Sequence, residues 1–366
     1  MKKLGFGFMR LPLLDGEDQT NVDMEQLCGM VDSFLEQGFI YFDTAYMYHS
    51  GKSEVALREA LVKRYPRDSF LVADKLPTMF LKEKEDMERI FDEQRERCGV
   101  EYFDYYLLHC LNKEHYEVAK RLGAFEFAVQ KKAEGKAHRI GFSYHDNAEL
   151  LDKILTEHPE MEFVQLQINY LDWEDANVQS RKCYEVARKH GKDIIVMEPV
   201  KGGTLANVPK KAEKLLKELE PEMSVPSWAI RFAAGLEGVI CVLSGMSNKA
   251  QLADNTSYMS DFKPFGEVQT SAVFKVADII NSSVAIPCTS CRYCVDGCPM
   301  NIPIPDYFGL FNAQMNEEDN QSAEYNKLSE KHGKASDCIE CGQCESQCPQ
   351  HIEIIKRLKD VAKTFE

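Results

Sequence analysis

The chain has 366 residues, of which 44% are hydrophobic and 28% are charged, as in ordinary globular proteins. That length suits two or three domains with a large buried core, and it excludes disordered chains and mini-protein scaffolds. The formal net charge of −15 repels phosphate backbones and anionic lipid, which argues against binding to nucleic acid or to a membrane surface.

Membrane insertion and secretion are also disfavoured by the sequence. No apolar run approaches the roughly 20 residues that cross a bilayer. The N-terminal stretch imitates a signal peptide only briefly, because Arg10 and Pro12 interrupt its apolar part and no small-residue cleavage site follows. We therefore expect a cytoplasmic protein.

From residue 4 to about residue 260, short apolar runs alternate with longer amphipathic runs. The apolar runs predict strands buried on both faces, at 4–9, 39–43, 70–75, 103–109, 139–143, 163–169, 193–198 and 238–245. The amphipathic runs predict helices at 24–37, 53–64, 83–98, 117–134, 147–157, 176–190, 223–235 and 249–259. This alternation predicts an α/β fold, the (β/α)8 or TIM barrel. A doubly wound open sheet is the alternative, but its usual G-x-G-x-x-G is incomplete at Gly5-Phe6-Gly7.

The 13 cysteines are distributed unevenly along the chain. Five are scattered singly through the barrel region and are expected to be buried hydrophobic residues: Cys28, Cys98, Cys110, Cys183 and Cys241. The other eight crowd into the last 80 residues. A disulfide framework explains neither this clustering nor its occurrence in a long cytoplasmic chain, whereas ligation of a metal or cluster explains both.

The clustered cysteines form two copies of one pattern, C-x2-C-x2-C-x3-C-P. The first block is Cys288, Cys291, Cys294 and Cys298, and the second is Cys338, Cys341, Cys344 and Cys348. This pattern holds [4Fe–4S] clusters, and the fourth cysteine of each block ligates the cluster of the other. We therefore predict two clusters, one held by the first three cysteines of block one with Cys348, the other by those of block two with Cys298. Zinc is the alternative, since C-x2-C pairs often bind it.

These patterns divide the chain into three parts. Residues 1–262 are assigned to the barrel, 263–286 to a connector with one helix near 268–281, and 287–366 to a small α-rich ferredoxin-like domain. The long spacing between the two cysteine blocks predicts an inserted helix there.

Three successive predicted strands end in a titratable residue, namely Asp43, Lys75 and His109. In a (β/α)8 barrel these ends meet at the carboxyl-terminal mouth, where catalysis takes place. An acid, a base and an imidazole buried together indicate tuning of a neighbouring pKa. The neighbour is Tyr48, five residues after Asp43. Nearby Tyr46 is expected to pack and His49 to be a solvated loop residue.

The motif D-T-A-x-x-Y, at residues 43–48, with a lysine and a histidine ending the next two strands, resembles the aldo/keto reductase family. The resemblance covers about residues 1–262, and with the tail the chain resembles the subgroup that carries a C-terminal dicluster ferredoxin domain. It implies that Tyr48 is the general acid, that Lys75 lowers the pKa of Tyr48, that Asp43 pairs with Lys75, and that His109 orients the carbonyl.

The same resemblance implies NAD(P)H bound across the barrel mouth. Ser143 and Gln165 match positions that hold the nicotinamide amide, and Gln251 and Asn255 match the adenosine-binding helix. Phosphates are expected at the loops after the seventh and eighth strands, which makes Gly202, Gly203, Ser244, Gly245 and Ser247 candidate ligands. The chain departs from the family pattern at Tyr144 and at Met197-Glu198-Pro199. The sequence does not decide between NADH and NADPH.

The sequence is compatible with three functions. The leading hypothesis is an oxidoreductase that reduces a small aldehyde or ketone, or oxidises the alcohol, by NAD(P)H hydride transfer through Tyr48. The alternative is an iron–sulfur electron-transfer reductase fed by a ferredoxin-type partner or a flavin, with FMN in the phosphate site of the barrel, because a flavin is the usual converter between hydride and single electrons. The third is a redox-sensing binding module with structural clusters.

Overall fold

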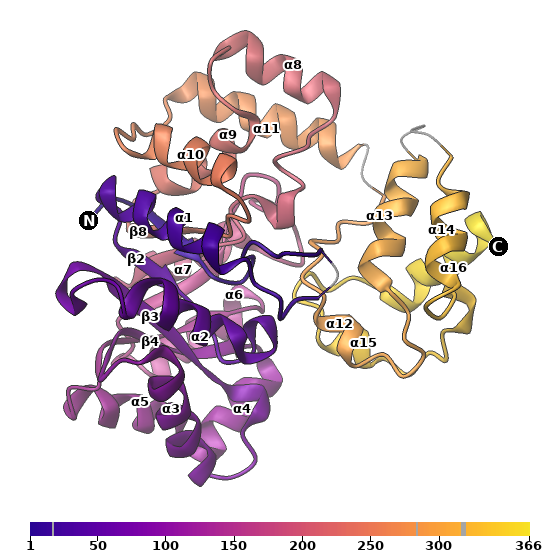
Figure 1. The fold of residues 1–366 in the computed structure, drawn as a ribbon. Coiled ribbons are helices and arrows are strands. Elements are labelled where there is room, and N and C mark those ends of the chain that lie inside the picture. The colour runs from indigo at the N-terminus through magenta and orange to yellow at the C-terminus, as the bar shows by residue number, and fades with distance from the viewer. Residues whose placement is uncertain (17, 283–284, 316–319) are drawn as a thin grey trace. The chain divides into compact units, whose positions relative to one another are not determined.

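The computed structural model describes residues 1–16, 18–282, 285–315 and 320–366 (Figure 1). The chain forms two compact units. The first contains residues 1–174, 179–199 and 227–266, and the second contains residues 175–178, 200–226 and 267–366. In the described part of the chain, no helix is long and apolar enough to cross a membrane.

The first unit is built on a closed barrel of parallel strands. In chain order these are β1 (Leu4–Gly7), β2 (Tyr41–Asp43), β3 (Leu71–Pro77), β4 (Phe103–Leu111), β5 (Ala137–Tyr144), β6 (Phe163–Gln167), β7 (Asp193–Met197) and β8 (Val239–Ser244). Each strand pairs with the next, and β8 closes the barrel by pairing in parallel with β1. The predicted (β/α)8 barrel is confirmed, and the doubly wound alternative is wrong because an open sheet has no such closing pair.

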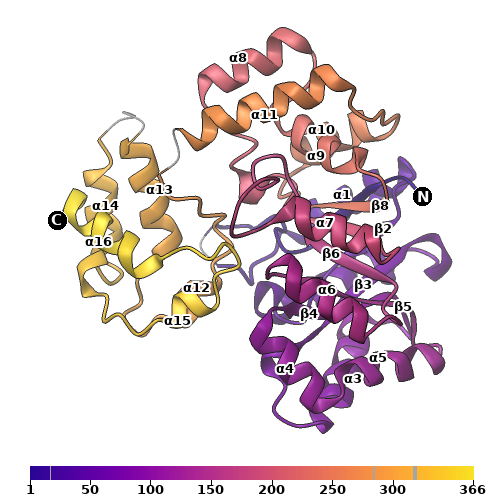
Figure 2. The ribbon, with the colours of Figure 1, turned by 180° about the vertical axis from the view of Figure 1, so that it is seen from behind.

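Helices form the outer layer of this unit, and Figure 2 shows α6 and α7 outside the strands. Their bounds are α1 (Met24–Glu36), α2 (Lys52–Leu57), α3 (Glu85–Cys98), α4 (Lys113–Leu122), α5 (Ala124–Ala133), α6 (Ala148–Glu157), α7 (Ser180–Lys189), α9 (Val225–Gly235) and α10 (Lys249–Met259). The predicted helix at 117–134 is two helices, because Gly123 adopts a left-handed φ of 78° between α4 and α5.

Large side chains fill the barrel interior and leave room for only glycine at some positions. Tyr41, Tyr105 and Phe163 pack there in one buried cluster. A Cβ on Gly5 would lie 2.7 Å from the Cys241 sulfur, closer than packed atoms approach. Cys98, Cys183 and Cys241 are buried as predicted, whereas Cys28 and Cys110 are only partly buried.

The second unit is helical. Its elements are α8 (Lys210–Leu219), α11 (Glu267–Asn281), α12 (Tyr293–Asp296), α13 (Ile304–Met315), α14 (Ser322–Ser329), α15 (Gln343–Ser346) and α16 (Ile354–Phe365). The expected connector helix is α11, and the stretch between the cysteine blocks contains α13 and α14. Helix α8 was not predicted from the sequence. It buries Ala212 and Leu216 and packs beside α11 (Figures 1 and 2).

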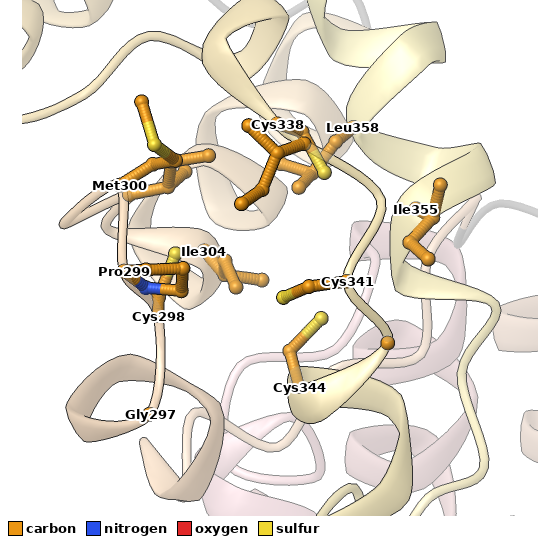
Figure 3. Close-up of a pocket in the computed structure, with 13 residues that line it drawn as sticks. Gly297, Cys298, Pro299, Met300, Ile304, Cys338, Cys341, Cys344, Ile355 and Leu358 are labelled. Carbon is orange, nitrogen blue, oxygen red and sulfur yellow. The ribbon is translucent and has the colours of Figure 1, made fainter.

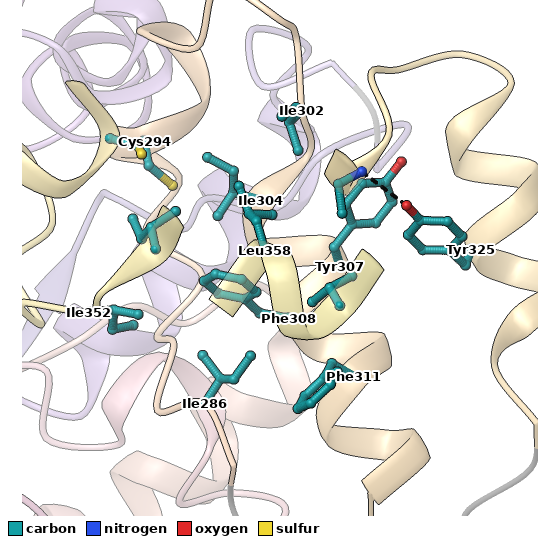
Figure 4. Close-up of a cluster of buried hydrophobic side chains, with 14 residues drawn as sticks. Ile286, Cys294, Ile302, Ile304, Tyr307, Phe308, Phe311, Tyr325, Ile352 and Leu358 are labelled. Carbon is teal, nitrogen blue, oxygen red and sulfur yellow. Dashed lines mark hydrogen bonds between the residues drawn. The ribbon is translucent and has the colours of Figure 1, made fainter. Parts of the chain in front are cut away.

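A separate apolar core stabilises the part of this unit that carries the cysteine blocks (Figure 4). Tyr307, Phe308 and Leu358 are at most 1% exposed within it. The Tyr325 hydroxyl accepts a hydrogen bond from the Ala335 backbone N–H at 3.0 Å, which fixes the chain just before the second block. The described residues of this region therefore have a core of their own.

Candidate active site and cysteine pockets

The ends of β2 and β3 form a buried ion pair. Lys75 is fully buried, and its Nζ donates hydrogen bonds to Asp43 Oδ1 and to the Thr44 carbonyl, both at 2.6 Å. Asp43 is 3% exposed. A buried charge is tolerated only when it is paired and hydrogen-bonded, so the Asp43 carboxylate and the Thr44 carbonyl together hold the ammonium in place.

Tyr48 and His109 complete the group at the same end of the barrel. Lys75 Nζ lies 4.9 Å from the centroid of the Tyr48 ring. The rings of Tyr48 and His109 have centroids 6.0 Å apart and meet edge to face. The four residues that the D-T-A-x-x-Y motif and the strand ends singled out are therefore brought together in the structure.

The loop that carries Tyr48 is anchored by its neighbour. His49 is 7% exposed, its Nε2 accepts a hydrogen bond from the Leu11 N–H at 3.2 Å, and its Nδ1 lies 2.7 Å from the Gln19 carbonyl. The expectation of a solvated loop histidine is wrong, because both ring nitrogens face backbone groups of the residue 11–19 segment and the side chain is buried. Tyr46 packs as expected, with the Arg97 guanidinium 4.4 Å from its ring centroid.

Burial dominates the acid–base properties of the group. It raises the pKa of Tyr48 well above 10, and the charges of Asp43, Cys110, Glu198 and Asp74 add to the effect. The Lys75 ammonium, 4.9 Å from the Tyr48 ring centroid, would stabilise a phenolate, but the net shift of the pKa is upward because burial outweighs it. Burial also raises the pKa of Asp43, with Lys75 opposing. Tyr48 is therefore a neutral phenol at physiological pH.

His109 is held in its neutral form. Burial lowers its pKa well below 6.5, and the Lys75 charge and two other histidines lower it further. Its buried Nδ1 has no hydrogen-bond partner within the part of the chain that the structure describes. A neutral imidazole can donate one hydrogen bond and accept another, which suits a group that orients a polar ligand.

Two predicted nicotinamide contacts lie on neighbouring strands, at paired positions of β5 and β6. Ser143 Oγ accepts a hydrogen bond from the Cys110 N–H at 2.7 Å, directly after His109. Gln165 is 3% exposed, and its buried Oε1 has no hydrogen-bond partner among the described residues. A buried amide oxygen without a donor is costly, so this atom is suited to accept a hydrogen bond from a ligand.

The candidate phosphate and adenosine residues after β8 already bond to the protein. Asn255 Nδ2 donates to Ser244 Oγ at 2.9 Å. The Ser247 N–H donates to Gln251 Oε1 at 2.7 Å. Beside them, a Cβ on Gly245 would lie 3.0 Å from the Arg10 Cβ. These contacts shape the loop, and a ligand that used the same polar atoms would exchange partners with them.

The two remaining candidates, Gly202 and Gly203, belong to the second unit. They lie in the short helix η5 (Lys201–Gly203). Gly202 has a φ of 63°, and a Cβ there would lie 2.0 Å from the Thr289 carbonyl oxygen. Backbone packing alone therefore requires a glycine at position 202, whether or not a phosphate binds nearby.

A buried acidic cluster beside Lys75 was missed in the sequence. Glu54, Asp74 and Cys98 are all fully buried, and their ligand atoms lie within 4.8 Å of one another. Asp74 Oδ1 accepts the Lys75 N–H at 2.8 Å. Burial, with the Asp74 charge, raises the pKa of Glu54 to about 9, against the opposing effect of Arg97. Only the alternation of strand β3, which turns Asp74 to the face opposite Lys75, could have suggested this cluster.

The eight clustered cysteines line two pockets, and each pocket takes residues from both blocks. Cys288, Cys291, Cys294 and Cys348 line one, here called the first-block pocket. Cys338, Cys341, Cys344 and Cys298 line the other, the second-block pocket (Figure 3). No disulfide links these eight cysteines, all of which lie in the described part of the chain. This grouping matches the crossed sets predicted from the repeated pattern.

The surroundings of the pockets suit thiolate-ligated clusters. The second-block pocket is lined otherwise by glycines and apolar residues such as Met300, Ile304 and Leu358. Burial raises the pKa of the Cys288 thiol, and the Lys201 charge opposes that rise. Four sulfurs around an apolar space supply the soft donor set that iron–sulfur clusters require.

Comparisons with known proteins place both parts of the chain. The family model for the aldo/keto reductase family matches residues 3–277, which is more than half of the chain. The chain belongs to the aldo/keto reductase family. A second model, the 4Fe-4S dicluster domain, matches residues 287–353 of this aldo/keto reductase and includes all eight clustered cysteines. The comparison with curated proteins gave no match.

Solved structures support the same fold. An aldo-keto reductase from Bacillus halodurans in its holo form is 22% identical, with a TM-score of 0.59 over 75% of this chain and 91% of that one. An aldo-keto reductase from Klebsiella pneumoniae in complex with NADPH is 17% identical, with a TM-score of 0.58 over 75% of this chain and 90% of that one. At these identities the likeness concerns the barrel fold.

Proposed function

We propose that this aldo/keto reductase reduces a small aldehyde or ketone, or oxidises the corresponding alcohol, with Tyr48 as the general acid and NAD(P)H as the hydride donor. The observation that carries the proposal is the Asp43–Lys75 pair, 2.6 Å apart, with the Lys75 ammonium 4.9 Å from the Tyr48 ring centroid. Reduction of a carbonyl by hydride transfer consumes one proton, and Tyr48 in this group can supply it.

Tyr48 supplies the proton. Because burial keeps it a neutral phenol, its hydroxyl proton is available for transfer to a carbonyl oxygen at physiological pH. The phenolate left behind carries a negative charge next to the Lys75 ammonium, which stabilises it. Asp43 holds that ammonium in position, and a neutral His109 is placed to hydrogen-bond the carbonyl oxygen and orient it.

The nicotinamide site is supported by Gln165. Its unpartnered Oε1 can accept a hydrogen bond from a carboxamide N–H, and Ser143 lies opposite it on β5. A bound nicotinamide cofactor supplies a hydride to the carbonyl carbon. The structural neighbour from Klebsiella pneumoniae, crystallised in complex with NADPH, supports a nicotinamide cofactor for this barrel.

We further propose that the first-block and second-block pockets each hold one [4Fe–4S] cluster, ligated by the crossed sets of four cysteines. Each pocket offers four sulfurs and an apolar lining, and the dicluster match supports the assignment. Such clusters carry single electrons. Zinc would also accept four thiolates, so iron and sulfide analysis of anaerobically prepared protein decides between the two metals.

The Tyr48→Phe variant tests the proposed chemistry. The phenyl ring keeps the packing against His109 and lacks only the hydroxyl group that donates the proton, so the turnover number should fall at least about 100-fold while NADPH still binds. Reduction of a good carbonyl substrate at an unchanged rate would contradict the role of Tyr48. Val129→Ala, on a side chain 40% exposed on the outer helix α5, is a control.

The second candidate is a reductase fed with single electrons by a ferredoxin-type partner or a flavin. The two cysteine pockets favour it, because carbonyl reduction by hydride transfer requires no cluster. Turnover driven by a reduced ferredoxin without NAD(P)H, or FMN released from anaerobically purified protein, would favour this candidate over the first.

A further inference from the structure

The segment that follows β7 contributes a buried cation to the first-block pocket. Lys201 lies four residues after the end of β7 and is 3% exposed. Its Nζ donates a hydrogen bond to Gln350 Oε1 at 3.1 Å, and Gln350 lines the first-block pocket. Both residues belong to the second unit.

The position of Lys201 is fixed by the close packing of its neighbour. Gly202 approaches the Thr289 backbone so closely that no side chain fits there, and Thr289 lies directly after Cys288 in the pocket lining. Lys201 itself adopts a left-handed φ of 46°, an uncommon conformation for a residue with a side chain. The ammonium is thus held beside the pocket by backbone packing and a hydrogen bond.

Other charges near the first-block pocket are more exposed than Lys201. Arg292 lines the pocket and forms an ion pair with Asp306 at 3.1 Å, and Asp306 opposes the effect of Lys201 on the Cys288 thiol. These two side chains are 46% and 35% exposed, so water screens their charges, whereas Lys201 is buried. The Glu345 charge raises the pKa of the Cys344 thiol in the second-block pocket and of the Cys348 thiol in the first-block pocket. Its effect therefore has the same direction in both pockets.

The second-block pocket has a different electrostatic environment. Among its described lining residues none carries a charge. The nearby Lys359 pairs with Glu340 at 2.8 Å, and both side chains are more than half exposed, so water and salt screen them.

We propose that Lys201 raises the reduction potential of the cluster in the first-block pocket above that of the cluster in the second-block pocket. This inference rests on the proposed function, which places one cluster in each pocket. Reduction of a cluster adds one negative charge, and a buried ammonium beside it stabilises that charge far more than an exposed one does. The charge of Lys201 is therefore expected to shift the one-electron equilibrium of its cluster by about tenfold, or about 59 mV.

Because the two reduction potentials would be unequal, electron transfer between the clusters would favour the first-block cluster. When a low-potential one-electron donor of the ferredoxin class reduces the second-block cluster, that electron moves to the oxidised first-block cluster. The second-block cluster returns to its oxidised state and the first-block cluster gains one electron, with no bond made or broken. The electron is then held beside the segment that leaves β7.

The test is a potentiometric titration followed by EPR, on full-length protein with its clusters and with dithionite as reductant. Lys201→Gln should lower only the higher of two potentials, by about 59 mV, which is a tenfold shift. Lys201→Arg should leave it close to the wild-type value. Lys214→Gln, on a lysine 78% exposed on α8, is the matched control and should change neither potential. Cys341→Ser, which alters a ligand of the second-block pocket, assigns the signals.

The possible results test the cluster content and the role of Lys201 separately. If iron and sulfide analysis finds fewer than two clusters in the wild type, the proposed cluster content fails. If two clusters are present and Lys201→Gln moves neither potential, or moves the one that Cys341→Ser alters, the role of Lys201 is refuted. Should Lys201→Gln lose its clusters, Gln350→Glu places a carboxylate against the same ammonium and must lower the same potential.

Discussion

Removal of the Lys75 ammonium should reveal how strongly the barrel depends on its buried ion pair. In Lys75→Met the buried Asp43 carboxylate loses the hydrogen bond that Lys75 donates to its Oδ1, and its Oδ2 has no partner among the described residues. Breaking a buried pair by removing one partner costs about 3–5 kcal/mol. We expect a loss of that size in the free energy of unfolding of the barrel, together with loss of carbonyl reduction.

The loss should depend on pH in a defined direction. Burial already raises the pKa of Asp43, and without Lys75 the pKa rises further. The native state of the variant then binds a proton that the unfolded chain releases above about pH 4, so its stability falls as the pH rises. Lys75→Met should therefore be closer to wild type at pH 5 than at pH 8.

A double variant separates stability from catalysis. Asp43→Asn combined with Lys75→Met replaces both charges by neutral groups of similar size, a change that is often neutral for stability. It should recover most of the lost stability and none of the activity. Urea unfolding is followed by tryptophan fluorescence, because both tryptophans, Trp173 and Trp228, lie in the barrel unit. A Lys75→Met protein as stable as wild type, or a double variant less stable than the single one, would refute the reasoning.

Three further substitutions test the roles of Glu54, Gln165 and Gly202. Glu54, whose pKa burial raises to about 9, gives the native state an extra proton between about pH 4.5 and 9, so wild-type stability falls with pH across that window. Glu54→Gln should flatten this fall in urea titrations, and an unchanged slope would show that Glu54 is ionised. Gln165→Leu should weaken NADPH binding by roughly 5- to 150-fold in calorimetry, because it removes the buried acceptor Oε1, and equal affinity would exclude the amide contact. Gly202→Ala should reduce the iron content, because a Cβ there would lie 2.0 Å from the Thr289 carbonyl oxygen, whereas Gly309→Ala, with open space around it, should not. Equal iron in both glycine variants would show that the 200–203 segment does not support the first-block pocket.

The barrel could be predicted from the sequence because its strands are buried on both faces. Such strands appear as short apolar runs, and β1 to β8 all overlap the runs that predicted them. The candidate catalytic group could also be predicted, since Asp43 ends β2 and Lys75 and His109 lie two residues before the ends of β3 and β4. The repeated cysteine pattern predicted which residues share a pocket, because three ligands of each set are close in the chain.

Features that depend on tertiary contacts could not be predicted from the sequence. Glu54 and Asp74 are 20 positions apart, and nothing local shows that both turn into one buried space. The burial of His49 could not be predicted from the sequence, because its partners, Leu11 and Gln19, precede it by about 30 residues or more. The upward direction of the Tyr48 pKa shift depends on burial and on nearby acidic groups, which only the folded geometry supplies.

The most direct test of the central claim follows a labelled hydride. Wild-type protein and Tyr48→Phe are incubated without oxygen with NADPH that carries deuterium at the nicotinamide C4 position, together with a panel of small aldehydes and ketones. If NADPH is the hydride donor and Tyr48 the acid, the wild type forms alcohol that carries one deuterium on the former carbonyl carbon. The variant then forms at least about 100-fold less of this alcohol. Alcohol that forms only when a reduced ferredoxin is supplied, without deuterium from NADPH, would contradict this prediction.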